Sequence, residues 1–112
     1  MWLKKSNENL AWLGDALIYW TISQTLYDPD QSNQRLTEKR KPFIEEQSLA
    51  KHAKELGLDE AIYITEGEEK QGGRKNPKNL HTVYEALIGA IYLDQGYEQT
   101  KGFIQKIALL EK

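Results

Sequence analysis

Apolar residues recur at helical spacing along most of the chain. Leu10, Leu13, Leu17 and Trp20 follow one another at intervals of three or four residues, which predicts a long helix over residues 7–27. The same kind of spacing recurs further along the sequence. Additional helices are predicted over residues 32–41, 45–55, 77–93 and 97–110.

Turn-forming residues separate these helices. Asp28-Pro29-Asp30 ends the first one, and Pro42 either interrupts the second or begins the third. Gly57 is the predicted C-cap of the third helix, and Gly96 separates the last two. Residues 58–64 combine helix-forming and strand-like residues, and we favour a short helix there.

A single all-helical domain covering residues 1–112 agrees with the length and composition of the chain. Hydrophobic residues make up 39% and charged residues 29%, as in soluble globular proteins. No apolar run approaches the roughly 20 residues that span a bilayer, so no membrane role is expected. The chain has no cysteine and its start lacks a signal-peptide pattern. We therefore expect a cytoplasmic or organelle-stroma protein.

Basic residues gather in two places although the net charge is −2. Each cluster is either a solvated surface or a contact for a polyanion. The first cluster falls in the second predicted helix and comprises Arg35, Lys39, Arg40 and Lys41. The second falls in a predicted glycine-containing loop over residues 67–79 and comprises Lys70, Arg74, Lys75 and Lys78.

Two acids stand within otherwise apolar helices. At 100° per residue, Asp15 falls on the side of the first helix opposite its leucine stripe, together with Trp12 and Tyr19. In the later helix, Glu85 lines up with Gly89 opposite the main apolar face. Gly89 would let another helix come close to Glu85.

A buried carboxylate needs a partner because an unpaired buried charge is costly. One reading is that Asp15 and Glu85 share a divalent cation, and oxygen ligands with open water positions suit Mg²⁺ or Mn²⁺. The alternative is that each acid bonds to a helix end or to a basic side chain. The helical pattern by itself leaves both readings open.

Three ordered motifs resemble the ribonuclease III family. Residues 7–16 read NENLAWLGDA and resemble the signature helix of that family. Residues 67–74 (GEEKQGGR) look like its glycine-basic loop, and residues 83–94 (VYEALIGAIYLD) look like its second acidic helix. Residues 48–50 and 55–58 also agree in order, so the resemblance covers nearly the whole chain.

The resemblance implies an all-helical endonuclease domain that forms a homodimer. It also implies a metal-dependent endoribonuclease that cleaves double-stranded or structured RNA, such as a ribosomal RNA precursor, to 5′-phosphate and 3′-hydroxyl ends. The cofactor implied is Mg²⁺, with Mn²⁺ as a substitute. By the same resemblance, Asp15 and Glu85 are the catalytic and metal-binding residues.

This chain departs from the pattern of the fuller family members, which carry four carboxylates at the metal site. The other two positions hold Ala11 and Thr82 here. The compact Mini-III branch, which lacks a double-stranded-RNA-binding domain, also has a small residue and a threonine at these positions. The chain is therefore identified as Mini-III-like, and its smaller set of carboxylates implies weak metal affinity.

The resemblance also suggests roles for residues around the two acids. Glu8 is either an outer-shell acid or an N-terminal charge favoured by the helix dipole. Thr82 either bonds water at the metal or turns its hydroxyl to the helix. Trp12 is expected to insert into a partner subunit at the dimer interface, with core packing inside one subunit as the alternative.

The remaining polar candidates concern RNA binding. Double-stranded RNA is read through its shape, phosphates and 2′-hydroxyls, so basic loops suffice for contact. His52 and His81 have no second histidine at ligand spacing and are read as structural, with contact to substrate as the alternative for His81, which adjoins the site. The main RNA-contact candidates are Lys70, Arg74, Lys75 and Lys78, and weaker ones are Arg35, Lys39 and Arg40.

Three hypotheses follow for function. The first is a homodimeric endoribonuclease. The second is a catalytically inactive ribonuclease III fold that binds RNA or a ribonucleoprotein, motivated by Ala11 and Thr82. The third is a helical dimerisation module whose acids satisfy internal partners.

Overall fold

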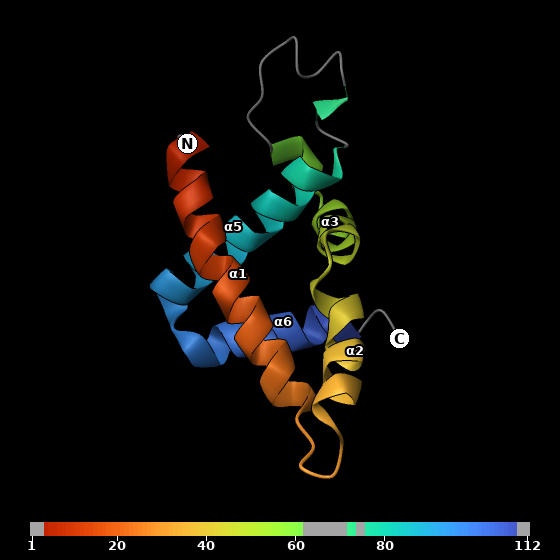
Figure 1. Cartoon of the computed structure of the whole chain (residues 1–112). Coiled ribbons are helices and arrows are strands. Elements are labelled where there is room, and N and C mark those ends of the chain that lie inside the picture. Colours follow the sequence, from red (N-terminus) through yellow and green to blue (C-terminus); the bar gives the residue numbers. More distant parts are fainter. Residues whose placement is uncertain (1–3, 62–71, 74–75, 110–112) are drawn as a thin grey trace.

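The computed structural model describes residues 4–61, 72–73 and 76–109, and this part of the chain is helical (Figure 1). The predicted all-helical fold class is thereby confirmed. Within the described residues, no helix combines the length and apolarity needed to cross a bilayer. The elements in chain order are α1 (Lys4–Leu26), α2 (Asn33–Ile44), α3 (Glu46–Glu55), the short 3₁₀ helix η1 (Leu58–Ala61), α5 (Pro77–Gln95) and α6 (Tyr97–Leu109).

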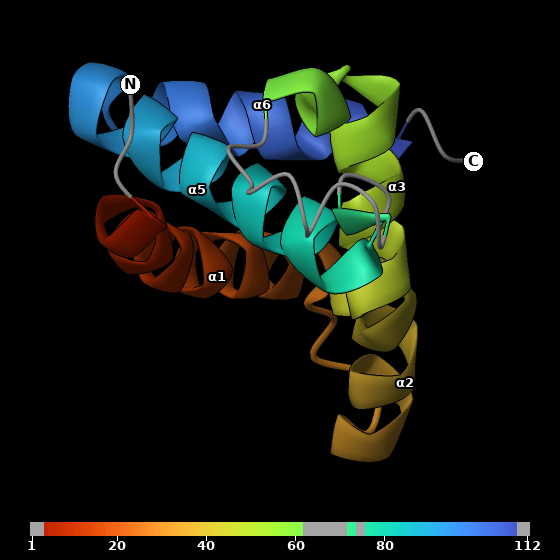
Figure 2. The same ribbon diagram turned by 90° about the horizontal axis from the view of Figure 1, so that it is seen from above.

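Helix α5 is the centre of the fold. It packs against α1, α3 and α6, and Figure 2 shows it between α1 and α6 with α3 across one end. Tyr84 and Ile88 of α5 are almost completely buried, as expected for a helix covered on several sides. The core around them is completed by Leu17, Ile18, Ile22, Leu49, Ala50, Ala53, Leu80, Ile104 and Ala108.

The ends of α5 follow from local sequence. The Asn76 side chain caps its start, because Asn76 Oδ1 accepts a hydrogen bond of 2.9 Å from the Lys78 amide. Pro77 takes the first helical position, where a missing N–H costs nothing. Gly96 ends the helix with a φ of +87°, a conformation that favours glycine. The predicted start at residue 77 and the separation at Gly96 are confirmed, and the helix runs two residues past the predicted end, to Gln95.

Two glycines allow α1 and α5 to cross in backbone contact. A Cβ atom on Gly14 would overlap the carbonyl oxygen of Glu85, and one on Gly89 would overlap the carbonyl oxygen of Leu10. The prediction that Gly89 lets another helix approach is therefore confirmed, and Gly14 is its counterpart on α1. Because Asp15 follows Gly14, the crossing fixes the place where an α1 acid and an α5 acid meet.

Helix α2 differs from the sequence prediction at its end. The Ser32 hydroxyl caps its start by accepting a hydrogen bond of 3.1 Å from the Arg35 amide. Pro42 lies inside the last turn instead of ending the helix, which continues to Ile44. Phe43 and Ile44 pack against the core, and this packing extends the helix past the proline.

The segment after α3 is only partly described. Gly57 follows the C-cap residue Leu56 and has a φ of +74°, so it terminates α3 as predicted. The predicted short helix is confirmed as η1 for residues 58–61. Residues 62–64 and most of the predicted loop over residues 67–79 lie outside the described residues.

Candidate active site

The structure brings Asp15 and Glu85 together at the crossing of α1 and α5. The two carboxyl groups lie close enough to interact directly, where the backbone of Gly14 meets that of Glu85. Glu85 is only 5% exposed, whereas Asp15 is an exposed residue. The pair is therefore covered by protein on the Glu85 side and open to solvent on the Asp15 side.

The electrostatics of the pair reflect two acids held close together. Burial raises the pKa of the Glu85 carboxyl above its ordinary value, and the contact with Asp15 raises it further. The contact with His81 acts in the opposite direction. A positive charge at this position would relieve the cost of holding Glu85 ionised beside Asp15.

His81, which the sequence analysis read as structural, is a direct neighbour of Glu85. Its Nε2 atom lies 3.2 Å from Oε1 of Glu85, one helical turn further along α5. This contact raises the pKa of the imidazole, although burial of the ring works against it. The spacing of four residues between His81 and Glu85 is the signal that could have found the pair.

The residues present fit a divalent cation bound by few protein ligands. Mg²⁺ is commonly held by one or two carboxylates, with water and substrate phosphates completing its coordination. Asp15 and Glu85 supply two such groups in mutual contact, with Asp15 on the open side. In the described part of the chain, no group of three or more acid or histidine side chains is arranged to hold a metal.

The two positions without carboxylates add no further ligand. Ala11 is 6% exposed, so its side of α1 is buried although Trp12 and Asp15 nearby are exposed. It lies against α5 because the glycine crossing brings that side of α1 into the interior. The Thr82 hydroxyl donates to the Lys78 carbonyl oxygen at 2.8 Å, which is the helix-facing role.

Glu8 and Trp12 lie on the exposed side of α1, as does Asp15. Helix α1 begins at Lys4, so Glu8 stands beyond the first turn, where the helix dipole has little effect. Trp12 is 79% exposed, and this excludes the alternative that it packs in the core of its own subunit. The outer-shell role of Glu8 and the interface role of Trp12 stay predictions.

The predicted RNA contacts are only partly placed. Lys78 is exposed in the first turn of α5, seven residues before Glu85, which is roughly 10 Å along the helix axis. That spacing places Lys78 on about the same side of α5 as Glu85. Lys70, Arg74 and Lys75 lie outside the described residues.

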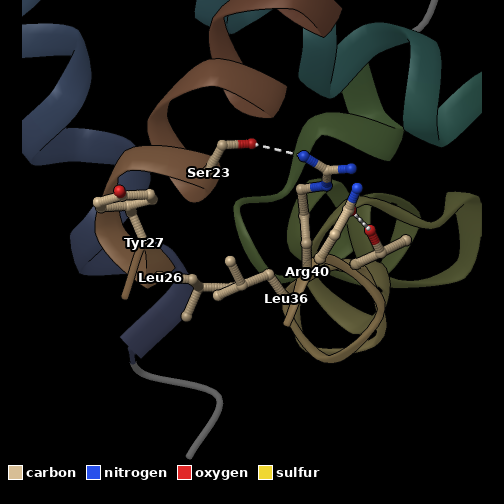
Figure 3. Close-up of a pocket in the computed structure, with 7 residues that line it drawn as sticks. Ser23, Leu26, Tyr27, Leu36 and Arg40 are labelled. Atoms are coloured by element: carbon tan, nitrogen blue, oxygen red, sulfur yellow. Dashed lines mark hydrogen bonds between the residues drawn. The ribbon is translucent and has the colours of Figure 1, made fainter. Parts of the chain in front are cut away.

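Arg40, a weaker candidate for RNA contact, is engaged inside the protein. Its guanidinium lies 4.0 Å from the centre of the Tyr19 ring. One of its N–H groups donates to the Ser23 hydroxyl at 2.9 Å, and Figure 3 shows this contact between α1 and α2. Arg40 thus helps to pack α2 on α1, at the side of a cavity of about 180 Å³. The residues that line it are Ser23, Leu26, Tyr27, Asn33, Leu36, Thr37 and Arg40.

His52 has the structural role that was predicted. It is 5% exposed, and its ring meets Tyr84 edge to face with a centroid distance of 5.5 Å. This contact joins α3 to α5 in the core. Helix α3 is thereby fixed beside the part of α5 that carries His81 and Glu85.

Known proteins resemble the chain over most of its length. A family described as Ribonuclease-III-like matches residues 3–111. Ribonuclease 3 of Bacillus cereus (strain AH187) is 43% identical over 105 residues, which is 92% of this chain and 43% of that protein. Ribonuclease 3 of Bacillus anthracis (strain A0248) matches equally well. The chain therefore spans less than half the length of these relatives.

Solved structures agree with the sequence matches. The nuclease domain of ribonuclease III from Campylobacter jejuni, solved at 2.2 Å resolution, superposes with a TM-score of 0.84 and 32% identity over 91% of this chain and 71% of that one. A second structure of that domain gives a TM-score of 0.86 and 33% identity over 91% and 73% of the two chains. That second structure shows structural flexibility in the region of the Campylobacter jejuni domain that is involved in dimer formation.

Proposed function

The chain belongs to the ribonuclease III-like family, as its motifs predicted, and we propose that it is a metal-dependent endoribonuclease. Its proposed substrate is double-stranded or structured RNA, such as a ribosomal RNA precursor in the cytoplasm or an organelle stroma. The products would carry 5′-phosphate and 3′-hydroxyl ends.

The observation that carries this proposal is the contact between Asp15 and Glu85. The sequence places these residues 70 positions apart, and the helix crossing brings their carboxyl groups together. Two acids in contact are destabilising unless a proton or a cation lies between them. An open acidic pair therefore supports a divalent-cation site.

Asp15 and Glu85 would hold the cation in this mechanism. When bound, it would neutralise charge on the scissile phosphate and lower the pKa of a water molecule. Glu85 is fixed within the protein by its burial, while Asp15 stands on the side that RNA can approach. The backbone contact between Gly14 and Glu85 fixes the position of Asp15 relative to Glu85.

Recognition of the RNA would depend on phosphates and shape. Lys78 is suited to a phosphate contact because it is exposed on about the same side of α5 as Glu85. Lys70, Arg74 and Lys75 are proposed to add further phosphate contacts. Affinity supplied in this way decreases as salt concentration rises.

We further propose that α1 mediates a homodimer. Its exposed side carries the large aromatic residues Trp12 and Trp20, which are 79% and 56% exposed, and Tyr19, which is 45% exposed beside Arg40. Aromatic residues gathered on one helix face are typical of interfaces. Trp12 lies one turn before Asp15, so dimer contacts would border the candidate active site.

A catalytically inactive RNA-binding protein is the second candidate. Ala11 is buried without a polar side chain, and Thr82 uses its hydroxyl on its own helix. Neither residue supplies the carboxylate that fuller family members have at these positions. Cleavage and binding must therefore be measured separately.

Wild-type protein is expected to cleave long double-stranded RNA in the presence of Mg²⁺ or Mn²⁺. Asp15→Asn should lower the cleavage rate about a thousandfold, because a lost metal ligand removes several kcal/mol of transition-state stabilisation. The measurement is gel analysis of end-labelled RNA. RNA binding is followed in parallel by mobility shift in Ca²⁺.

The two readouts separate the hypotheses. RNA binding by a wild-type protein that does not cleave would favour the inactive RNA-binding candidate. Failure of both cleavage and binding would favour a dimerisation module. Asp94→Asn, which removes an exposed acid from the other end of α5, should leave the rate unchanged.

Trp12→Ala is expected to convert a dimer into a monomer. An aromatic residue at the centre of an interface commonly contributes about 2 kcal/mol or more, so the dimer Kd should rise at least thirtyfold. Sedimentation over a concentration series measures this Kd. Leu93→Ala is the matched control, since Leu93 is 66% exposed but lies on α5. Equal dimer affinity in wild type and Trp12→Ala would rule out the proposed interface.

A further inference from the structure

His81 is held on both sides of its ring. Nε2 lies 3.2 Å from Oε1 of Glu85, and Nδ1 lies 3.3 Å from the carbonyl oxygen of Lys78. Nδ1 also lies 3.9 Å from Oε1 of Glu46, the first residue of α3. Both nitrogens therefore face oxygen atoms. Glu85 and Lys78 lie within hydrogen-bonding distance of the imidazole, and Glu46 adds a longer electrostatic contact.

The contact with His81 restricts the orientation of the Glu85 carboxylate, whose oxygens are the candidate metal ligands. A glutamate side chain has three rotatable bonds, and burial alone does not determine how its terminal carboxylate is turned. A contact from His81 to Oε1 fixes one oxygen and with it the plane of the group. Glu85 also touches Asp15, so its orientation decides how the two acids face one another.

Helix α3 supports this arrangement from outside the acidic pair. Glu46 approaches His81 from α3, and α3 is itself packed on α5. A chain of contacts thus runs from Glu46 through His81 to Glu85. Such outer contacts to a metal ligand commonly set its orientation and its affinity for the metal.

We propose that His81 is a positioning residue that holds the Glu85 carboxylate in the orientation in which Glu85 and Asp15 bind a divalent cation. This inference rests on the proposed function. His81 acts through Glu85 and is not itself a ligand, because its Nε2 atom is directed at the Glu85 oxygen.

Mn²⁺ binding tests the proposal without relying on cleavage. The free ion is counted by electron paramagnetic resonance during titration of wild type, His81→Ala, His81→Gln and Asp15→Asn. His81→Ala should weaken Mn²⁺ binding about tenfold, which is the lower range for loss of an outer contact. His81→Gln should restore most of the affinity, because a glutamine amide four residues before Glu85 can also donate to its carboxylate.

The outcomes separate this inference from the function on which it rests. If Asp15→Asn loses Mn²⁺ binding while His81→Ala binds like wild type, His81 has no positioning role and the proposed site stands. If wild type and Asp15→Asn bind Mn²⁺ equally, the proposed site itself is wrong and the inference falls with it. Asp94→Asn is the matched control for loss of an exposed acid and should leave the affinity unchanged.

Two further readouts exclude other roles for His81. Pulsed resonance should show no directly coordinated ¹⁴N nucleus in the Mn²⁺ complex. A ¹⁴N coupling that disappears in His81→Ala would make His81 a ligand and overturn the positioning role. Thermal unfolding of apo protein identifies a merely structural role, in which Tm falls for both His81 variants while Mn²⁺ affinity stays at the wild-type value.

Discussion

Gly14→Ala is expected to lower the free energy of unfolding by about 3 kcal/mol, although alanine favours helices more than glycine does. In an open helix this substitution would be stabilising. At Gly14 the new Cβ atom overlaps the carbonyl oxygen of Glu85, so α1 and α5 must move apart. This substitution costs much stability because the Glu85 carbonyl oxygen is a backbone atom, which cannot move away by a change of rotamer.

Gly102→Ala is the matched control for this prediction. Gly102 lies in α6, is exposed, and has nothing within 4 Å of the position that a Cβ would take. It should therefore gain about 0.5–1 kcal/mol from the lower backbone entropy of the unfolded chain. Urea unfolding followed by circular dichroism, at one protein concentration, measures both variants. Equal stabilisation by both would show that the helices do not cross in backbone contact at Gly14.

Glu85→Gln is expected to abolish cleavage and at the same time stabilise the fold. Cleavage should fall about a thousandfold, as for loss of any metal ligand. Burial raises the pKa of Glu85, so the folded protein favours the neutral form. The neutral Glu85 carboxyl therefore adds to the free energy of unfolding. This contribution is fully present below the pKa that Glu85 has in the unfolded chain, and it is lost as pH rises through the higher pKa of Glu85 in the folded protein. A neutral glutamine avoids that loss.

The pH at which stability is compared matters, because His81 contacts Glu85. The raised pKa of His81 contributes stability below the pKa of an unfolded histidine, and that contribution is lost as pH rises through the folded value. Glu85→Gln should thus exceed wild type in Tm at about pH 8.5 and lose this advantage near pH 4, where the carboxyl is protonated. A lower Tm than wild type at the higher pH would contradict the cost assigned to ionised Glu85.

Much of the fold could be predicted because its signals are local. Asn76-Pro77 and Gly96 set the ends of α5 through a side-chain cap, a fixed φ and a left-handed turn. Pro42 misled the prediction, since the packing of Phe43 and Ile44 on the core continues α2 past it. Packing of this kind depends on distant residues and outweighs a local helix-breaking signal.

The candidate site could be predicted in part. Asp15 and Glu85 stand out because acids interrupt apolar helices, and Gly89 indicated a close approach. The burial of Ala11 could not be read from helical periodicity, because the crossing with α5 decides which side of α1 is covered. The contact between His81 and Glu46 also depends on tertiary structure, since it joins α5 to α3.

The most direct test of the central claim is a crystal structure determined in Mn²⁺ with anomalous diffraction. A shared cation site predicts an anomalous peak in contact with carboxylate oxygens of both Asp15 and Glu85. The peak should be absent from Glu85→Gln crystals grown in the same Mn²⁺ concentration. Wild-type crystals without a peak at this pair, or with Mn²⁺ bound only elsewhere, would contradict the claim that these two acids form the metal site.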